Sequence, residues 1–393
     1  MNLDEILSRG VANVIPSKDE LKRVLESRKL NIYLGIDATA TKIHLGHAVP
    51  LRIIQKFAEL GHNVTFLIGD FTALIGDTSD KDSERPILTH EQIEENFKTY
   101  KNQAEKILDF SKIRVVHNSE WLSKLGFKDV VELTQKFSLG DFISRELIKR
   151  RLSDGGRIGL HEVLYPVMQG YDSYFMDTDL QVGGTDQTFN MQAGRSLQKM
   201  LRDKDAFVLS TAFLEGTDGR KMSKSWGNAI WLDDAPRDMF GKVMSIKDEI
   251  LIDYYTLGTS VPLDEIKAIE NRLSQGENPI KVKKELAFII VSELHDEQAA
   301  EEAKDFFEKT VQNHEIPSEI PDFEMKSDDH VTIADLLVNA NLASSKSEAK
   351  RLVEQGGVYI NDEVVEQPNL EVIPEDNTII KAGKRNYIRI KVK

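Results

Sequence analysis

The chain has 393 residues and a formal net charge of −14, so it is too long for one ordinary hydrophobic core and we expect two or three domains. It contains no cysteine, which excludes disulfides, thiolate metal ligands and a cysteine nucleophile and suits a cytoplasmic protein. No apolar run approaches the roughly 18 residues that cross a bilayer, and the first ten residues lack the apolar region of a signal peptide, so we expect no membrane partner and no export.

The first two hundred residues predict an α/β fold. Apolar runs of strand length lie at 31–36 and 64–69, and the residues between them, 45–60, have apolar side chains at helical spacing. A strand, a helix and a second strand in about forty residues imply a parallel sheet. The later elements expected of this region are strands at 113–117 and 206–210 and helices at 133–151 and 165–174.

The composition changes near residue 235. Residues 235–315 are expected to form an α-helical domain, because they have charged faces and few strand-like runs. Residues 316–330 contain two prolines and mixed charge, which predicts a linker. Residues 331–393 are expected to form a small α+β domain of two short helices followed by strands.

The acidic charge is unevenly distributed. Residues 331–393 hold nine basic and nine acidic residues, so the whole charge of −14 falls on residues 1–330. Residues 381–393 hold six basic residues and no acid. Because screening limits charge interactions to about 10 Å, such a patch can bind RNA on an acidic protein.

The tetrapeptide His44-Leu45-Gly46-His47 follows a predicted strand and opens a predicted helix. A helix N-terminus offers unpaired N–H groups and partial positive charge to a phosphate, and imidazoles there can stabilise charge that grows in a transition state. Gly46 would let an adenine ring approach the backbone. Alone, the tetrapeptide is explained equally well by two capping histidines and a packing glycine. The acid and hydroxyl of the upstream residues 37–40 favour the functional interpretation.

A second motif, KMSKS at 221–225, follows a turn signal at 218–220. Its two lysines are compact charges suited to phosphate, and a mobile loop can close over a triphosphate. A solvated basic loop is the alternative, but both motifs together in one chain are not expected by chance.

At these two motifs the sequence resembles the class I aminoacyl-tRNA synthetases. The resemblance implies that an amino-acid carboxylate attacks the α-phosphate of ATP, that pyrophosphate leaves, and that a terminal ribose hydroxyl of tRNA then attacks the aminoacyl carbonyl. Magnesium is expected to arrive with ATP, held mainly by phosphate oxygens, with no tightly bound protein-ligated metal. The catalytic residues implied are His44, His47, Lys221, Lys224 and Ser225.

Tyr165, Gln169 and Asp172 lie at positions i, i+4 and i+7 of one predicted helix face. Alone, this stripe is better explained by a buried helix with one satisfied network. Together with Tyr33 it resembles the pocket of the tyrosyl-tRNA synthetases, which implies that Tyr33 and Asp172 bind the substrate phenol. Enzymes of this type reject phenylalanine strongly without editing, because it leaves such groups unpaired. The remaining tyrosine-binding residues implied are Asp37, Asp77, Tyr165, Gln169 and Gln187.

The stretch 181–187, with the sequence QVGGTDQ, resembles the glycine-rich segment of the same family. Its aspartate can accept hydrogen bonds from both ribose hydroxyls, although a simple turn is the alternative. The loop after Asp77 departs from the family pattern, with Thr-Ser-Asp in place of Pro-Ser-Gly, and its Lys81 and Arg85 could reach pyrophosphate. The ATP-binding residues implied are Thr39, His44, Gly46, His47, Gly184, Asp186, Lys221 and Lys224.

Residues 332–373 resemble an S4 RNA-binding domain. Ser345 is expected to cap a helix whose basic residues project to one side, with RNA contacts made mostly to phosphates and shape. A neutral α+β module for protein contacts is the alternative. The RNA-binding residues implied are Lys346, Lys350, Arg351, Lys384 and Arg385.

Together the resemblances run in order along nearly the whole chain. They imply a Rossmann-like parallel-sheet catalytic domain over 1–234, with an inserted helical segment within about 70–165, then a helical domain on the anticodon side, then the S4-like domain of the bacterial type. They also imply L-tyrosine, ATP and tRNA(Tyr) as partners and a homodimer formed through the inserted segment. A tryptophanyl-tRNA synthetase, which shares the fold, is the nearest alternative. A non-catalytic RNA-binding protein or a small nucleotidyltransferase fits the combined motifs less well.

Overall fold

The computed structural model of the protein describes residues 3–37, 41–77, 89–223, 226–312, 320–326, 331–361, 363–373, 375–383 and 386–393. The chain divides into two compact units, Met1–Ala300 and Glu301–Lys393, and each is described by itself.

The first unit is built on a six-stranded sheet in the order β1-β6-β5-β2-β3-β4. Only β1 is antiparallel to its neighbour, β6. The strands are β1 (Val11–Ile15), β2 (Asn31–Ile36), β3 (Asn63–Ile68), β4 (Ile113–His117), β5 (Leu180–Gly184) and β6 (Phe207–Thr211). The central strands are nearly continuous apolar runs, as expected where helices cover both faces of a parallel sheet.

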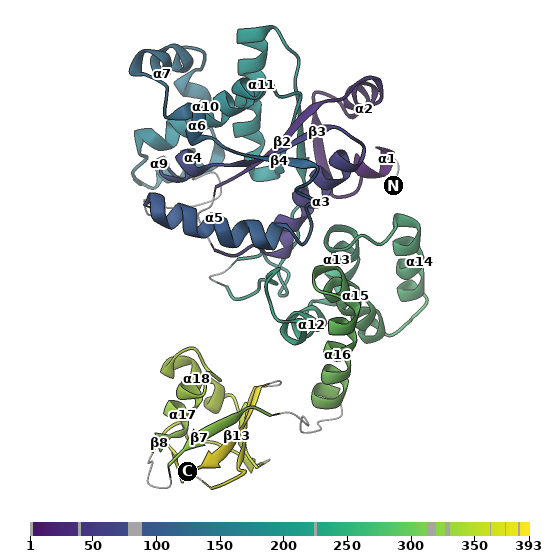
Figure 1. The fold of residues 1–393 in the computed structure, drawn as a ribbon, viewed down its shortest axis with the longest axis vertical. Coiled ribbons are helices and arrows are strands. Elements are labelled where there is room, and N and C mark those ends of the chain that lie inside the picture. The colour runs from purple at the N-terminus through teal and green to yellow at the C-terminus, as the bar shows by residue number, and fades with distance from the viewer. Residues whose placement is uncertain are drawn as a thin grey trace. The chain divides into compact units, whose positions relative to one another are not determined.

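Two crossover helices lie on opposite faces of this sheet. The chain passes from β2 through α3 (Leu45–Glu59) to β3, and from β5 through α11 (Thr188–Arg202) to β6, in opposite directions along the sheet. Right-handed crossovers therefore place α3 and α11 on opposite faces, as Figure 1 shows. The strand order reverses between β2 and β5, and ligands of such sheets bind outside the carboxyl ends of the strands at this switch point.

The remaining helices of this region cover the sheet and its edges. They are α1 (Leu3–Ile6), α2 (Lys18–Ser27), α4 (Asp70–Ala73), α5 (His90–Ala104), α6 (Ser119–Leu122), α7 (Phe127–Thr134), α8 (Leu139–Ile143), α9 (Glu146–Ser153) and α10 (Leu160–Phe175). The strands expected at 31–36 and 113–117 are confirmed, and those expected at 64–69 and 206–210 are each shifted by one residue.

The expectation of one helix over 133–151 is wrong. This part of the chain contains three short helices, because two residues between them are extended. Ser138 has ψ 132° and its hydroxyl accepts from the N–H of Gly140, which starts α8; Arg145, also at ψ 132°, precedes α9. Apolar side chains continue at helical spacing through both breaks, so periodicity alone did not reveal them.

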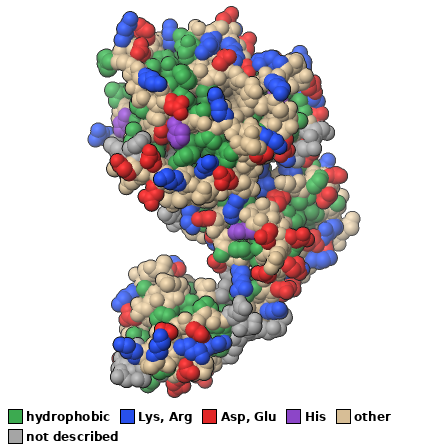
Figure 2. Space-filling view, viewed as in Figure 1, with side chains coloured by type: hydrophobic (Ala, Val, Ile, Leu, Met, Phe, Trp, Pro, Cys, Tyr) green, Lys and Arg blue, Asp and Glu red, His purple; other side chains and the backbone are tan. Residues whose placement is uncertain are grey.

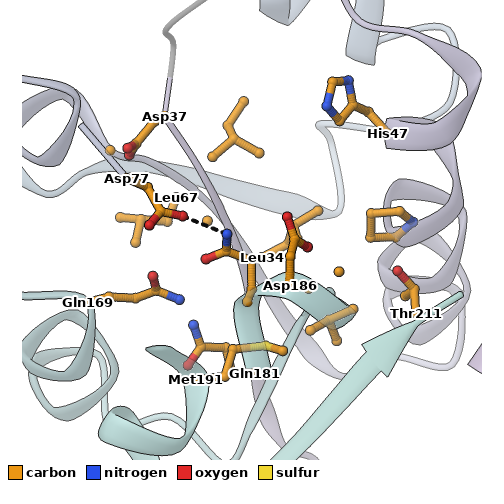
Figure 3. A pocket seen from close by; sticks show the side chains of 18 of the residues that line it. Leu34, Asp37, His47, Leu67, Asp77, Gln169, Gln181, Asp186, Met191 and Thr211 are labelled. Atoms are coloured by element: carbon orange, nitrogen blue, oxygen red, sulfur yellow. Dashed lines mark hydrogen bonds between the residues drawn. The ribbon is translucent and has the colours of Figure 1, made fainter. Parts of the chain in front are cut away.

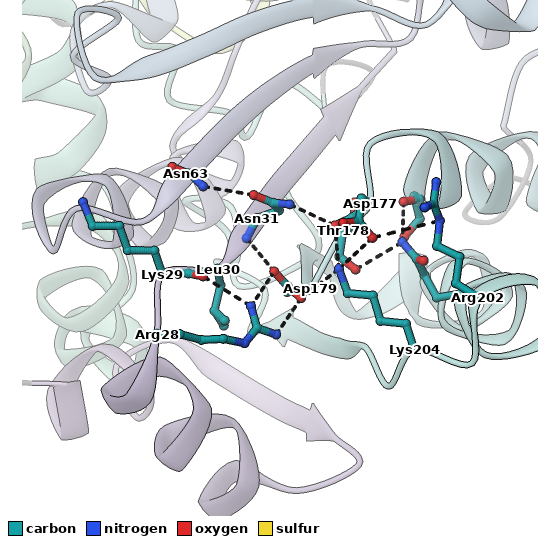
Figure 4. Close-up of polar contacts among 12 residues, drawn as sticks. Arg28, Lys29, Leu30, Asn31, Asn63, Asp177, Thr178, Asp179, Arg202 and Lys204 are labelled. Atoms are coloured by element: carbon teal, nitrogen blue, oxygen red, sulfur yellow. Dashed lines mark hydrogen bonds and ion pairs between the residues drawn. The ribbon is translucent and has the colours of Figure 1, made fainter.

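An ion-paired cluster holds the amino ends of β2 and β5 together (Figure 4). The carboxylate of Asp179, which is 2% exposed, accepts from both terminal nitrogens of Arg28 at 3.1 and 2.8 Å and from the N–H of Asn31 at 2.8 Å. Lys204 lies 2.9 Å from the same carboxylate. Because the charged groups are paired and hydrogen-bonded, this buried carboxylate stabilises the junction, and the pKa of Asp179 is lowered from its usual range chiefly by the hydrogen bond from Arg28, against burial that raises it.

Helices complete the first unit. They are α12 (Pro236–Met244), α13 (Leu251–Gly258), α14 (Leu263–Ser274), α15 (Pro279–Leu294) and α16 (Glu297–Phe307), the last of which runs across the division at residue 300. Among the described residues of 235–315, every regular element is a helix, as expected.

The second unit packs two helices, α17 (Ile333–Asn339) and α18 (Lys346–Glu354), against a five-stranded sheet in the order β10-β9-β12-β13-β7. The prediction that Ser345 caps a helix is confirmed, because its hydroxyl accepts from the N–H of Glu348 at 3.2 Å. The strands of this unit are β7 (Asp322–Met325), β8 (Val331–Thr332), β9 (Val358–Ile360), β10 (Glu363–Val364), β11 (Glu371–Val372), β12 (Ile379–Ala382) and β13 (Asn386–Val392).

The prediction of a linker over 316–330 is wrong at β7 (Asp322–Met325), because this segment is a strand that pairs in parallel with β13. Phe323 and Met325 pack on the core of the second unit, and the carbonyl of Pro321 accepts from the N–H of Arg389. A proline just before a strand does not interrupt the ladder, so Pro321 was a misleading linker signal. Within the described residues, no helix is both long enough and apolar enough to span a bilayer.

Candidate active site

A pocket of about 320 Å³ lies at the carboxyl ends of β2 and β5, at the switch point. In Figure 3, Asp37, Asp77 and Gln169 lie on one side of it and His47 on the other, with Asp186 between them. Every small-molecule site residue predicted from the sequence that the structure describes lines this pocket: Tyr33, Asp37, His44, Gly46, His47, Asp77, Tyr165, Gln169, Asp172, Gly184, Asp186, Gln187 and Lys221.

Some predicted residues lie outside the described part of the chain. They are Thr39, Lys81, Arg85, Lys224 and Ser225 of the pocket set and Lys384 and Arg385 of the RNA-binding set.

One end of the pocket holds a buried carboxylate, that of Asp172 on α10, which is 2% exposed. It accepts hydrogen bonds from the indole Nε1 of Trp121 at 2.7 Å and from the amide Nδ2 of Asn118 at 3.1 Å. Burial raises the pKa of Asp172 to about 8, although these two hydrogen bonds lower it. Room for a further donor remains, because a carboxylate offers about four lone-pair sites.

Tyr33 completes this end of the pocket from β2. Its hydroxyl donates to the backbone carbonyl of Gln169 at 3.4 Å, and its ring is 1% exposed. Burial, and after it the charge of Asp172, raises the pKa of Tyr33 well above its usual value, so the hydroxyl stays protonated and can donate.

Sequence reasoning missed the two donors that hold Asp172. Asn118 follows β4 directly and is fully buried; it also donates to Thr72 and accepts from the N–H of Phe71. Trp121 lies one turn later in α6 (Ser119–Leu122) and stacks on Phe175 at 4.6 Å. A usable signal was present, since a polar residue directly after a parallel strand falls at the ligand-binding edge of the sheet.

Two further carboxylates stand beside this end of the pocket. Asp37 accepts from the hydroxyl of Tyr165 at 2.9 Å and from that of Thr72 at 2.8 Å, and Asp77 accepts from the amide of Gln187 at 2.7 Å. Burial and the nearby Asp37 carboxylate raise the pKa of Tyr165 well above its usual value. Oriented carboxylates in a recess attract a cation such as a substrate ammonium.

Gly69 makes room for the Asp37 carboxylate. A Cβ atom at this position would lie 2.1 Å from Oδ1 of Asp37 and 2.4 Å from Oγ1 of Thr72. The residue between β3 and α4 therefore has to be glycine for this arrangement, which sequence reasoning did not identify.

The other end of the pocket is formed by the start of α3. His44 is the extended residue before the helix, and its ring stacks on that of His47 with centroids 3.7 Å apart. Burial, and after it the neighbouring His47 and Lys221, lower the pKa of His44 to about 2, so the ring is neutral at pH 7. Neutral imidazole can still donate one N–H to an anion. A Cβ on Gly46 would lie 3.0 Å from the His44 ring, so this glycine also leaves room for the stack.

Asp186 and Lys221 face this end from other segments. Asp186 lies on the 3₁₀ turn Thr185–Gln187 after β5, and a Cβ on Gly184 would lie 2.5 Å from its carboxylate. The ammonium of Lys221 lies 5.3 Å from the centroid of the Phe213 ring, which is half exposed.

The KMSKS segment is held by Asn228, a further residue that sequence reasoning missed. Its side chain is buried; it donates to the carbonyl of Lys221 at 3.2 Å and to Asp218 at 2.7 Å, and it accepts from the N–H of Ser223 at 2.9 Å. A Gly-Asn pair just after the lysine motif was the available signal, because asparagine commonly bonds nearby backbone in turns.

The predicted RNA-binding residues that the structure describes lie on one helix of the second unit. Lys346, Lys350 and Arg351 are exposed residues of α18, and Lys346 pairs with Asp335 of α17 at 2.5 Å. Among the described residues, no group of three or more histidines, cysteines, aspartates or glutamates is arranged to hold a metal ion.

Comparison with known proteins gives consistent matches along the chain. The family described as "tRNA synthetases class I (W and Y)" matches residues 25–312, and the "Tyrosine--tRNA ligase SYY-like C-terminal domain" matches residues 312–390. A tyrosine--tRNA ligase of Thermotoga maritima is 42% identical over 388 residues, covering 98% of this chain and 96% of the relative. One of Dehalococcoides mccartyi is 43% identical over 387 residues, covering 98% of this chain and 97% of the relative.

A solved structure of similar fold is the C-terminally truncated mitochondrial tyrosyl-tRNA synthetase of Coccidioides posadasii. It has a TM-score of 0.63 and 23% identity, covering 77% of this chain and 90% of that one. The matched C-terminal domain belongs to tyrosine ligases, which favours them over the tryptophan branch. The chain belongs to the tyrosyl-tRNA synthetases, aminoacyl-tRNA ligases of class I.

Proposed function

We propose that this pocket activates L-tyrosine with MgATP to form tyrosyl-adenylate and then transfers the tyrosyl group to the 3′-terminal ribose of tRNA(Tyr). The observation that carries the proposal is that one pocket has two chemically different ends. A buried carboxylate and a tyrosine hydroxyl lie at one end, and a helix N-terminus with two stacked imidazoles lies at the other.

The tyrosine phenol is proposed to bind between Tyr33 and Asp172. The phenol donates to the carboxylate of Asp172 and accepts from the hydroxyl of Tyr33, so both of its hydrogen-bonding functions are satisfied. Tyr165, Gln169 and Asp77 then hold the substrate ammonium. Asp37 and Gln187 lie near the amino acid and its reacting carboxylate. This is supported by the hydrogen bonds that already orient these groups: Tyr165 on Asp37, and Gln187 on Asp77.

The triphosphate is proposed to lie at the start of α3. The N–H groups of the first turn, the neutral ring of His44 and the ring of His47 donate to phosphate oxygens, and Lys221 and Lys224 neutralise the leaving pyrophosphate. Asp186 accepts from the ribose hydroxyls. Mg²⁺ enters as part of the MgATP substrate, and the protein contributes positioning and charge rather than a covalent intermediate.

The chemical step is the in-line attack of the tyrosine carboxylate on the α-phosphorus. A carboxylate oxygen forms the new P–O bond, the bond to the bridging oxygen breaks, and pyrophosphate carries away the electron pair. In the second step the terminal ribose hydroxyl attacks the aminoacyl carbonyl and AMP leaves. Thr39, Ser225, Lys81 and Arg85 are proposed to assist with the phosphates from segments outside the described residues.

The RNA partner is proposed to bind the helical domain, 235–315, and the S4-like domain. In the second, the exposed Lys346, Lys350 and Arg351 of α18 present charge along one helix for phosphate contacts, joined by Lys384 and Arg385. The proposed catalytic domain covers 1–234. We place the enzyme in the cytoplasm, which suits a chain without cysteine.

A homodimer is proposed to form through the inserted helices. Large apolar side chains are exposed on α7 to α10, and Figure 2 shows apolar surface on the part of the first unit where Figure 1 labels α7. An apolar face of this kind marks an interaction surface. The residues are Phe127 (86% exposed), Leu160 (74%), Leu139 (61%) and Phe175 (50%).

Amino-acid-dependent exchange of pyrophosphate into ATP, run with each of the twenty amino acids, tests the proposed reaction. Exchange with tyrosine alone is expected. Exchange driven by tryptophan and not tyrosine would favour the tryptophanyl alternative, and no exchange alongside tight tRNA binding would favour a non-catalytic RNA-binding protein.

A further inference from the structure

The segment that leaves the KMSKS loop is joined to the start of α3 by backbone hydrogen bonds. We name Ile230–Asp234 the exit segment. The N–H of Leu45 donates to the carbonyl of Ile230, and the N–H of Leu232 donates to the carbonyl of Ile43, both at 2.9 Å. His44 and Trp231 therefore lie opposite each other in a short antiparallel bridge. The two motifs are connected physically as well as by facing the same pocket.

Three aromatic rings continue this connection into the pocket. The Trp231 ring lies 5.8 Å from that of His44 and tilted by 55°, and His44 stacks on His47 at 3.7 Å. Because the half-buried His44 ring contacts both of the other rings, its position depends on where the exit segment holds Trp231.

Asp234 fixes the exit segment to the helices that follow it. One carboxylate oxygen accepts from the N–H of Trp231 at 2.8 Å, and both lie 2.6 Å from the ammonium of Lys242 on α12. The backbone carbonyl of Asp234 lies 3.0 Å from Nε2 of His295, which follows α15 directly. From the other side, Lys106, just after α5, donates to the carbonyl of Leu232 at 2.6 Å.

We propose that Asp234 is a positioning residue for adenylate formation. It acts through Trp231 on the His44 and His47 rings, which links the helices after residue 235 to the ATP end of the pocket. The proposal rests on the phosphate role given above to the two histidines. The Asp234 carboxylate is 11% exposed, so its paired bonds are shielded from water and hold a defined geometry. A displacement of about 1 Å at reacting groups can cost about 100-fold in rate.

The first experiment compares Asp234→Ala with the wild-type enzyme in tyrosine-dependent pyrophosphate exchange. We expect kcat to fall about 10- to 100-fold, while the dissociation constant for tyrosine stays within about twofold, because Tyr33 and Asp172 lie at the other end of the pocket from the His44 ring. Asp264→Ala is the matched control: it removes an exposed aspartate from α14 and should leave both values unchanged. An unchanged kcat in Asp234→Ala, or an equal loss of tyrosine binding, would overturn the proposal.

A conservative series separates positioning from stability. Asp234→Asn keeps an oxygen that can accept from the N–H of Trp231 and should retain more of kcat than Asp234→Ala. Lys242→Met removes the ion pair from the other side and leaves that acceptor in place, so it should also give an intermediate loss. It remains informative even if Asp234→Ala does not fold. If both variants lost kcat completely and also lost tyrosine binding, as a misfolded protein would, the positioning role would be contradicted.

A double-mutant cycle tests whether Asp234 acts through the Trp231 ring. Trp231→Leu should itself lower kcat, and adding Asp234→Ala should then cost little more, because coupled residues are not additive. Losses that multiply would show that the two residues act separately and would overturn the proposed route. His44→Ala is the reference arm: if His44→Ala leaves exchange unchanged, the phosphate role fails. If His44→Ala slows exchange and Asp234→Ala does not, the phosphate role stands and this proposal alone fails.

Discussion

At the scale of single residues, the carboxyl group that we propose as the binding site of the substrate phenol already has hydrogen-bond partners within the protein. Asp172 holds two hydrogen bonds from Trp121 and Asn118 with no substrate in place. A substrate without a hydroxyl therefore leaves Asp172 underbonded but not bare, and it leaves the hydroxyl of Tyr33 to the carbonyl of Gln169 and the side chains of Gln181 and Ser173. Under this proposal, discrimination against phenylalanine depends on both hydrogen bonds of the substrate hydroxyl: the one that it donates to Asp172 and the one that it accepts from Tyr33.

Asp172→Ala should weaken the use of tyrosine far more than the use of ATP. Leaving the buried phenol hydroxyl without its acceptor costs about 1–3 kcal/mol, so the KM for tyrosine should rise about 5- to 150-fold. The KM for ATP should stay within about threefold, because the nucleotide is bound at the other end of the pocket. Exchange kinetics with each substrate varied in turn measure both values, and similar losses for the two substrates would count against the phenol role.

The raised pKa of Asp172 predicts how stability depends on pH. Folding raises the pKa of this carboxyl from a usual 3.8 to about 8, chiefly through burial, so the folded protein binds the proton more tightly than the unfolded chain does. Its contribution to stability is complete below about pH 4 and is lost as pH rises towards 8. Asp172→Asn cannot ionise, so the Tm of the ligand-free wild type should fall more between pH 5 and 8 than that of the variant. Parallel Tm profiles would contradict this.

Sequence analysis identified the pocket residues that belong to a motif. It missed the residues outside the motifs that hold those side chains in place. Every described pocket residue chosen from the motifs lines the pocket, but Asn118, Trp121, Gly69 and Asn228 were missed. The roles of Asn118, Trp121 and Gly69 arise from contacts between segments far apart in the chain, and that of Asn228 arises from contacts within one loop. Spacing along one helix or strand encodes neither kind of contact.

At the scale of elements, the KMSKS loop depends on an anchor outside the motif. Asn228 holds the carbonyl of Lys221 and the N–H of Ser223, so it fixes the base of the loop that carries the lysines.

Asn228→Ala should slow adenylate formation about tenfold, because the loss of its buried hydrogen bonds loosens the loop. Tyrosine affinity should stay nearly intact. Lys224→Ala is the comparison variant and should have the same pattern of slower chemistry with unchanged tyrosine binding. Stopped-flow measurement of adenylate formation and equilibrium dialysis of tyrosine distinguish the two effects; an unchanged rate in either variant refutes the assignment of its residue to the loop.

Helices and strands were predicted well where a single pattern of apolar residues matches one element. They were predicted poorly where the backbone breaks an element without breaking the pattern. The parallel strands are short buried runs bounded by polar residues, and all four expected positions were found within one residue. The helix expected at 133–151 failed because Ser138 and Arg145 adopt extended conformations between segments of continuous helical periodicity.

At the scale of the whole molecule, the proposed homodimer predicts that one surface substitution halves the molecular mass measured in solution. Leu160→Asp places a charge on an apolar side chain that is 74% exposed, so it should convert a dimer to a monomer with no loss of Tm in the isolated chain. Size-exclusion chromatography with light scattering measures this, with Met200→Asp, an exposed apolar residue on α11, as the control. A wild-type monomer would exclude the dimer.

The second unit predicts separable activities. Truncation after residue 312 should spare pyrophosphate exchange and impair charging of tRNA, because the pocket lies wholly in the first unit. The cut belongs before β7, since a cut at 330 would leave that strand without its partner β13 and expose its edge. Charging assays with tRNA(Tyr) test this expectation. Unimpaired charging by the truncated chain would mean that the second unit is not needed to bind the tRNA. The position of β7 could not be predicted, because its partner strand lies some sixty residues later.

The Asp179 cluster has a consequence for the order in which the molecule is made. Asp179 joins β5 to Arg28 and Asn31 across about 150 residues, 151 for the arginine pair. During synthesis β2, β3 and β4 emerge first and can pair, while the other edge of β2 waits for β5 and the long intervening chain. We expect the half of the pocket around Tyr33 to exist as an open strand edge on the ribosome until residue 180 has left the exit tunnel, and the nascent chain to need protection there.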